Sequence, residues 1–90
     1  MGYIIVKMKI MPKSPETDLG VIEKKILAIL KKEKVAKFQK EIQPIAFGLK
    51  AFIIFFSWPE EKPLESVEEK IRSFEETGSV EILDMRRAIG

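Results

Sequence analysis

The chain contains no cysteine and no histidine among its 90 residues. The absence of cysteine excludes a disulfide framework and a thiolate metal site. The absence of histidine removes the commonest general base and the commonest metal ligand. Nucleophilic triads need such a base beside the nucleophile, so their usual forms are excluded. The five glycines are scattered along the chain, so no phosphate-cradling loop is predicted.

Long apolar runs are also missing. No segment approaches the ~20 apolar residues of a membrane span, and no basic and apolar leader precedes a small-residue cleavage site. We therefore expect a cytoplasmic protein that has no membrane partner. Hydrophobic residues make up 46% of the chain and charged residues 33%, which predicts one small globular domain over residues 1–90.

The charge is unevenly distributed, although the net charge is only +2. Residues 1–50 carry 11 lysines against 5 acidic residues, whereas residues 51–90 carry 5 basic against 9 acidic residues. Two interpretations are open: solvated helix faces that differ in sign, or a basic patch that faces an acidic or phosphate-bearing partner. The adjacent carboxylates Glu60-Glu61 and Glu75-Glu76 are expected to be solvated, because no matching ligand shell accompanies them. We predict neither a metal nor a cofactor, and interpret the chain as a binding module rather than an enzyme.

The period of the hydrophobic pattern changes from two to 3.6 and back, twice along the chain. Apolar residues three or four apart predict amphipathic helices near residues 18–32 and 63–76. Thr17 or Asp18 is expected to cap the first helix, and Gly78 is expected to end the second. The predicted strands cover residues 3–11, 35–42, 49–58 and 80–89.

The order strand, helix, strand, strand, helix, strand predicts a ferredoxin-like βαββαβ sandwich of the α+β class. In this fold a four-stranded antiparallel sheet carries both helices on one face. The first strand alternates, and its predicted core face consists of Ile4, Val6, Met8 and Ile10.

The strand over residues 49–58 is apolar on both faces, which predicts a central position in the sheet. The residues that we expect to face the helices are Leu49, Ala51, Ile53 and Phe55. The strip that we expect on the helix-free face consists of Lys50, Phe52, Ile54 and Phe56, together with Tyr3. This strip is either part of the core or a platform on which nucleic-acid bases stack, as in an RNA-recognition motif. The glycines of that motif are not in their usual places here, so the match to it is weak. RNA binding is therefore kept as the alternative function.

The turn before this strand contains Pro44, Ile45, Ala46, Phe47 and Gly48. Gly48 suits a backbone with positive φ, and Pro44 stiffens the entry to the turn. An aromatic side chain at such a tip is either a lid over the end of the sheet or an exposed anchor for a partner's pocket.

Near the other end of the sequence, Arg86 and Arg87 follow Asp84 in the last predicted strand. The two arginines are either a solvated strand end or a positive tip that is aimed at phosphates or carboxylates.

Three segments together resemble the archaeal translation elongation factor 1-beta family. They are Met11-Pro12-Lys13-Ser14-Pro15 after the first strand, Pro44-Ile45-Ala46-Phe47-Gly48-Leu49-Lys50-Ala51 in the middle, and Asp84-Met85-Arg86-Arg87 near the end. The resemblance covers the whole chain in the same order, and the middle segment is its most specific part. It implies the ferredoxin-like fold already predicted.

The resemblance also implies a function and a partner. The family exchanges guanine nucleotide on elongation factor 1-alpha, the GTPase that delivers aminoacyl-tRNA to the ribosome. Phe47 corresponds to the aromatic residue that enters a pocket of the GTPase, and the C-terminal segment reaches toward the nucleotide and its magnesium ion. Eukaryotic relatives place a lysine there, and this chain lacks that lysine. The resemblance implies that Arg86 or Arg87 takes its role.

The partner-binding residues that we predict are Pro44, Ile45, Ala46, Phe47, Gly48, Lys50, Asp84, Arg86 and Arg87. We expect a monomer that does not bind nucleic acid directly.

Overall fold

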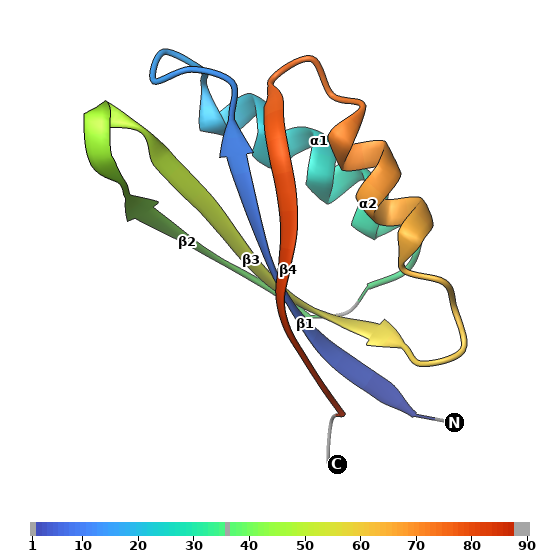
Figure 1. The fold of residues 1–90 in the computed structure, drawn as a ribbon. Coiled ribbons are helices and arrows are strands. Elements are labelled where there is room, and N and C mark those ends of the chain that lie inside the picture. The colour runs from blue at the N-terminus through green and yellow to red at the C-terminus, as the bar shows by residue number, and fades with distance from the viewer. Residues whose placement is uncertain (1, 36, 88–90) are drawn as a thin grey trace.

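The structure, a computed structural model, describes residues 2–35 and 37–87. Within these ranges the chain forms four strands, two α-helices and one short 3-10 turn (Figure 1). In chain order they are β1 (Tyr3–Pro12), α1 (Leu19–Lys32), β2 (Phe38–Pro44), η1 (Ala46–Gly48), β3 (Lys50–Pro59), α2 (Glu65–Arg72) and β4 (Thr77–Arg87). No helix in the described part of the chain is long and apolar enough to cross a membrane.

The sheet has the strand order β2-β3-β1-β4, and every neighbouring pair of strands is antiparallel. Both helices lie on the same face of the sheet (Figure 1). Strand β1 is central and pairs with β3 on one side and with β4 on the other. The predicted ferredoxin-like βαββαβ sandwich is therefore confirmed.

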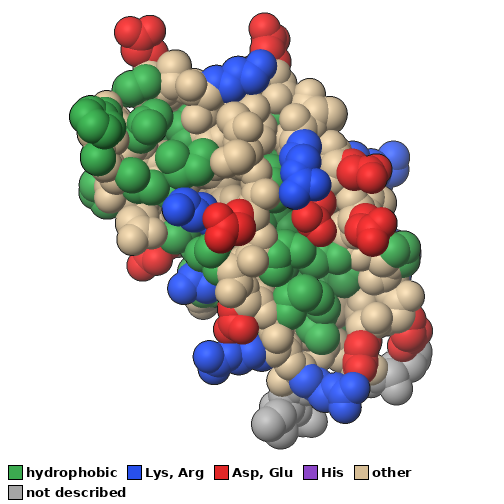
Figure 2. Space-filling model, viewed as in Figure 1, with side chains coloured by type: hydrophobic (Ala, Val, Ile, Leu, Met, Phe, Trp, Pro, Cys, Tyr) green, Lys and Arg blue, Asp and Glu red, His purple; other side chains and the backbone are tan. Residues whose placement is uncertain are grey.

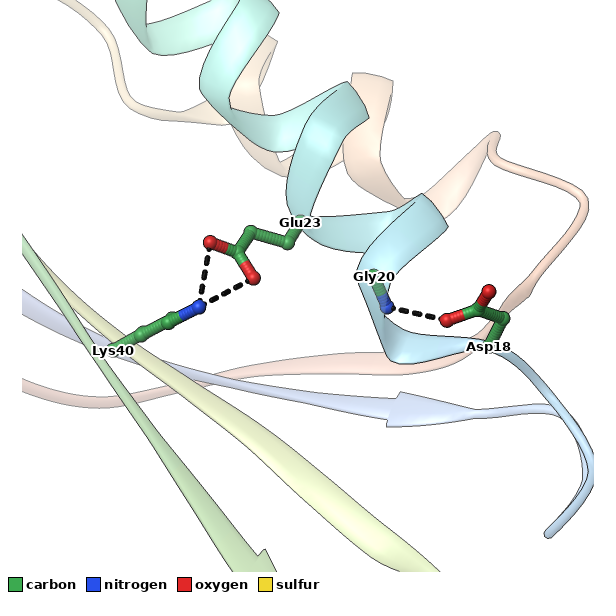
Figure 3. A network of polar contacts seen from close by, with 4 residues as sticks. All are labelled: Asp18, Gly20, Glu23 and Lys40. Carbon is green, nitrogen blue, oxygen red and sulfur yellow. Dashed lines mark hydrogen bonds and ion pairs between the residues drawn. The ribbon is translucent and has the colours of Figure 1, made fainter.

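Helix α1 begins at the predicted cap. The Asp18 Oδ1 atom accepts a hydrogen bond from the backbone N–H of Gly20 at 2.8 Å, which satisfies one of the free amides of the first turn (Figure 3). The helix buries one face against the sheet, and this face consists of Ile22, Ile26 and Leu30. These residues belong to the predicted apolar stripe, and the spacing is that of an amphipathic helix.

Strand β2 begins at Phe38, three residues later than predicted. Val35 takes part in the C-terminal end of α1 instead, because its N–H donates to the Leu30 carbonyl at 2.9 Å. At its other end β2 continues through Pro44, which pairs with Lys50 of β3. Proline is tolerated there because β2 is an edge strand, where a missing donor breaks no ladder. Predicted strand position 36 lies outside the described residues.

Helix α2 is shorter than predicted, and the prediction that Gly78 ends it is wrong. The helix has Ser73 as its C-cap, and Gly78 lies inside β4 at a shift in register. A Cβ atom on residue 78 would stand 2.8 Å from the Pro12 carbonyl oxygen. The glycine therefore allows the close approach of two strands. Strand β4 begins earlier than predicted, at Thr77, and predicted positions 88–89 lie outside the described residues.

The core shows that the predicted facing of β3 is wrong. The β3 residues that pack with the helices are Phe52, Ile54, Phe56 and Trp58. In register they stand opposite Ile10, Met8, Val6 and Ile4 of β1, the face that was predicted to be buried. The helix-free face of β3 therefore carries Ala51, Ile53 and Phe55, because side chains alternate along a strand. Leu49 precedes the strand.

This correction removes the basis of the RNA-binding alternative. Phe52 and Phe56 are each 1% exposed beneath the helices, so neither ring is available to stack on a base. Of the proposed strip only Tyr3, which is 54% exposed, lies on the helix-free face. Phe55 does lie there, but it is half-buried and the Lys7 ammonium stands 5.4 Å from its ring centre.

Candidate partner-binding site

The hairpin between β2 and β3 places six of the predicted site residues together. Its loop is closed by a hydrogen bond from the Ile45 N–H to the Leu49 carbonyl at 2.7 Å, just beyond the Pro44 and Lys50 pair. Residues Ala46–Gly48 form the 3-10 turn η1 at the tip. The segment is short and internally bonded, so its tip has a defined direction.

Phe47 occupies the extreme of this tip. Its side chain is 93% exposed, so the interpretation as a lid over the sheet is wrong. Its backbone adopts φ 64° and ψ 29°, the left-handed region, and Gly48 follows at φ 77°. Such a conformation costs a residue with a Cβ atom about 1–2 kcal/mol, and a bulky residue rarely adopts it. An exposed and strained aromatic residue contributes nothing to the core that would compensate for this cost.

The connection between β1 and α1 supports the hairpin from one side. A Cβ atom on Gly48 would stand 3.8 Å from the Pro15 Cβ atom, which is van der Waals distance. The connection is itself rigid, because the Ser14 and Thr17 side-chain oxygens lie 3.2 Å apart and the Thr17 N–H donates to the Ser14 carbonyl. Sequence reasoning missed Pro15 as a neighbour of the tip.

Helix α1 supports the hairpin from the same face. Figure 3 shows Lys40 of β2 reaching Glu23 of α1, with its Nζ atom 2.7 and 2.8 Å from the two carboxylate oxygens. Lys40 therefore ties the edge strand β2 to helix α1.

A groove lies between these supports. It encloses about 290 Å³. It is lined by Pro12, Pro15, Thr17, Asp18, Leu19, Gly20, Ile42 and Lys50. Ile42 is 50% exposed there, although its partner in register, Phe52, is in the core. Figure 2 shows hydrophobic side chains gathered over this hairpin end of the molecule, at the upper left.

The C-terminal end of β4, which carries Arg86 and Arg87, lies at the opposite end of the sheet (Figure 1), and Asp84 stands opposite Lys7 in the middle of β1. Arg86 stands opposite Ile5 of β1, which in turn stands opposite Ser57 near the end of β3. Ser57 lies seven positions along β3 from Lys50 beside the hairpin, a span of about 24 Å at ~3.4 Å per residue. The structure therefore does not bring Phe47 and the arginines together.

The two arginines are exposed, and each has an acidic partner. Arg86 Nε donates to Asp84 Oδ2 at 2.7 Å, and Arg87 donates to Glu60 across the end of the sheet. These are surface ion pairs, which contribute little to stability.

A second groove of about 460 Å³ lies near this end, lined by Tyr3, Ile5, Glu33, Lys34, Val35, Lys37, Ser57, Pro59 and Lys62. Sequence reasoning missed it because its walls come from separate segments.

Two carboxyl groups have shifted pKa values, and neither belongs to the predicted site. The hydrogen bond and charge of Lys62 lower the pKa of Glu33, and the hydrogen bond from Lys25 lowers the pKa of Glu76. Across residues 2–35 and 37–87 no group of three acidic, histidine or cysteine side chains is arranged to hold a metal ion.

Known proteins match this chain over almost all of its length. Residues 5–88 match the EF-1 guanine nucleotide exchange domain family. An elongation factor 1-beta from Methanobrevibacter smithii is 43% identical over 89 residues, which cover 97% of this chain and 98% of that protein. Elongation factors 1-beta from Nanoarchaeum equitans and Metallosphaera sedula are 37% and 34% identical over 82 and 89 residues. These matches cover 90% and 97% of this chain, and 100% and 97% of the two proteins. The chain belongs to the EF-1 guanine nucleotide exchange domain family.

Proposed function

We propose that this chain promotes the exchange of GDP for GTP on elongation factor 1-alpha, and that Phe47 is its main anchor in that GTPase. The observation that carries the proposal is the Phe47 side chain, 93% exposed on a left-handed backbone at the tip of a braced hairpin. Strain that the surrounding structure imposes on an exposed residue is typical of ligand-binding positions. The family membership supplies the kind of partner.

The hairpin suits an anchor because it is ordered before binding. The Ile45 to Leu49 hydrogen bond fixes the loop, and Pro15 lies beside Gly48 at the tip. The ring therefore loses little conformational entropy when it enters a pocket, which leaves more of the contact energy for affinity. Buried aromatic anchors contribute roughly 2–4 kcal/mol to typical protein interfaces.

Exchange by this route needs no reacting side chain. The chain has to bind the GTPase more tightly when nucleotide and Mg²⁺ are absent, and by reciprocity it then weakens their binding by the same factor. In this proposal the protein is not an enzyme, and it supplies a rigid surface that favours one state of its partner.

The C-terminal segment is the second part of the proposal. We propose that Asp84, Arg86 and Arg87 contact the same GTPase, with one arginine directed to its nucleotide and magnesium site. Because this segment lies about 24 Å along the sheet from the hairpin, the partner has to cover the length of the sheet. The ion pairs of Arg86 with Asp84 and of Arg87 with Glu60 are exposed, so opening them costs little.

We further propose that residues 1–90 work as a single exchange domain, as a monomer in the cytoplasm, without binding nucleic acid directly. The match of residues 5–88 to one domain family supports the first part. The shared function of the relatives in translation supports the location.

The release of labelled GDP from archaeal elongation factor 1-alpha tests the proposal. We expect Phe47→Ala to slow exchange by about 30-fold or more, because 1.4 kcal/mol corresponds to tenfold. Its melting temperature should stay close to wild type, since the ring is 93% exposed. Leu27→Ala removes a 39% exposed side chain on α1 and serves as the control that leaves exchange unchanged. Wild-type exchange by Phe47→Ala would refute the role of Phe47.

A further inference from the structure

The groove beside the hairpin is an open surface of mixed apolar and polar character next to the proposed anchor. One wall is the β1–α1 connection with Pro15 and Leu19, and the other is the hairpin with Ile42 and Lys50. Ile42 lies on the helix-facing side of β2, yet it is 50% exposed, so the helix does not complete the cover of this strand. An incompletely covered apolar side chain on a structured groove is a common feature of interaction sites.

The groove is continuous with the surface that carries Phe47. Pro15 lines the groove and is also in van der Waals distance of a Cβ atom placed on Gly48, the residue after Phe47. A partner that encloses the Phe47 ring therefore lies over the mouth of the groove as well. With about 290 Å³, the groove lies just below the ~300–1,000 Å³ that are typical of small-molecule sites, and it suits a protein side chain.

The charge at the groove indicates the chemistry of its occupant. Lys50 is exposed, and among the ion pairs of the described residues none involves it. Asp18 on the opposite wall uses one carboxylate oxygen to cap α1 at Gly20. The surrounding half of the chain, residues 1–50, carries 11 lysines against 5 acidic residues. An acidic group in the partner would therefore find an unused cation here.

We infer that this groove receives an apolar side chain of the GTPase, flanked by a carboxylate that pairs with Lys50, while Phe47 enters the GTPase. The two proteins then interlock in both directions, and Ile42, Pro15 and Leu19 form the floor of the receiving side. The inference rests on the proposed function, because it assigns the occupant to the same partner. A contact next to a buried aromatic anchor also excludes water from it, which strengthens the anchor.

The test compares the binding of four variants to nucleotide-free elongation factor 1-alpha. Ile42→Arg fills the groove with a charged side chain, and we expect it to weaken binding by about tenfold or more. Lys50→Glu reverses the charge, and we expect a loss of about fivefold that shrinks at high salt. Ile42→Val keeps an apolar floor and should bind within about twofold of wild type. Leu27→Arg places the same new charge on α1, away from the groove, and should bind like wild type.

Melting temperatures of all four variants separate docking from folding. Ile42 is half exposed on an edge strand, so we expect Ile42→Arg to stay folded. If Ile42→Arg unfolds, the binding of Lys50→Glu tests the inference instead, because the Lys50 side chain is exposed and its replacement should not unfold the chain. A loss of affinity that shrinks at high salt supports the inference, and wild-type affinity overturns it.

Phe47→Ala measured beside these variants separates the two proposals. Wild-type binding by Ile42→Arg and Lys50→Glu, with weak binding by Phe47→Ala, would overturn the inference and leave the proposed function intact. Wild-type binding by Phe47→Ala would overturn the proposed function itself. If Ile42→Arg instead abolishes a self-association seen by light scattering, the groove is an interface between copies of this chain, and the inference is wrong.

Discussion

At the scale of single residues, Lys34 and Phe47 share a left-handed backbone for different reasons. Lys34 has φ 61° and follows α1, where its N–H donates to the Lys31 carbonyl and the next N–H donates to the Leu30 carbonyl. This is a Schellman motif, which requires a left-handed residue at that place. Phe47 has φ 64° at a hairpin tip where glycine would be unstrained. A large aromatic residue at such a position is therefore explained by binding better than by folding.

The variants Phe47→Gly and Lys34→Gly should both raise the free energy of unfolding, by about 0.5–1 kcal/mol each. Glycine removes the ~1–2 kcal/mol cost of the left-handed backbone but increases the entropy of the unfolded chain. Urea unfolding measures both changes. The rate of nucleotide exchange distinguishes the roles of the two residues. Phe47→Gly should lose most of its exchange activity, and Lys34→Gly should keep it. A clear loss of stability in Phe47→Gly would mean that the ring supports the fold.

The sequence predicted part of this local picture. Glycine after an aromatic residue and proline before it indicated a turn with positive φ, and Gly48 has it. The same pattern did not show whether the Phe47 ring is a lid or an anchor, because that depends on what lies around the tip. It also did not show Pro15, since contacts between segments 33 residues apart leave no local pattern.

At the scale of the elements, the predicted helices and strands differ from the observed ones mainly at their ends, where one residue type is compatible with two different structures. Val35 was assigned to a strand because residues 35–42 alternate in two opposed sets, but the N–H of Val35 is bonded at the end of α1. Gly78 was assigned to a helix end because glycine commonly ends helices, but it lies where Pro12 comes close. For Val35 the boundary was set by a hydrogen bond to Leu30 within the helix end. For Gly78 it was set by the close approach of Pro12, which is distant in the sequence.

The ion pair between Lys25 of α1 and Glu76 makes stability depend on pH. Glu76 lies just before β4, and its Oε1 atom is 2.7 Å from the Lys25 Nζ atom. This hydrogen bond lowers the pKa of Glu76 from its ordinary 4.5. The unfolded chain therefore binds this proton more readily, so the pair stabilises the fold above pH ~4.5 and loses its effect as the pH falls through the folded pKa.

We expect Glu76→Gln to reduce the fall in stability between about pH 6 and pH 3, compared with wild type. Urea unfolding at both values measures it. Glu75→Gln changes the neighbouring carboxyl, which forms no ion pair among the described residues, and serves as the control. An unchanged pH dependence in Glu76→Gln would show that the pair is not linked to folding.

At the scale of the whole molecule, the order of the elements was predictable and the facing of β3 was not. Two changes of hydrophobic period were enough for the βαββαβ order. In β3, however, apolar residues lie on both faces, so alternation cannot show which face meets the helices. The register with β1 decides it, because Ile4, Val6, Met8 and Ile10 alternate with more exposed residues. The hairpin and the arginines lie at opposite ends because β3 and β4 both run antiparallel to β1, so the start of β3 and the end of β4 point to different ends of the sheet.

Two truncations in β3 test the corrected facing. Phe52→Ala should cost about 3–5 kcal/mol of unfolding free energy, the range for a buried phenylalanine. Phe55→Ala, on the helix-free face, should cost clearly less, roughly 1–2 kcal/mol, because its ring is half-buried against Lys7. Urea unfolding of both variants measures the difference. The reverse order would mean that the helices cover the other face.

Exchange by this route requires that the chain bind its partner more tightly when nucleotide is absent. The dissociation constants of wild type and Phe47→Ala for nucleotide-free and for GDP- and Mg²⁺-loaded elongation factor 1-alpha test it directly. We predict that wild type binds the nucleotide-free form on the order of 100-fold more tightly, within the usual range of such coupling. Phe47→Ala should lose most of its affinity for that form. Equal affinities of wild type for the two forms would contradict the account, because such binding cannot accelerate exchange.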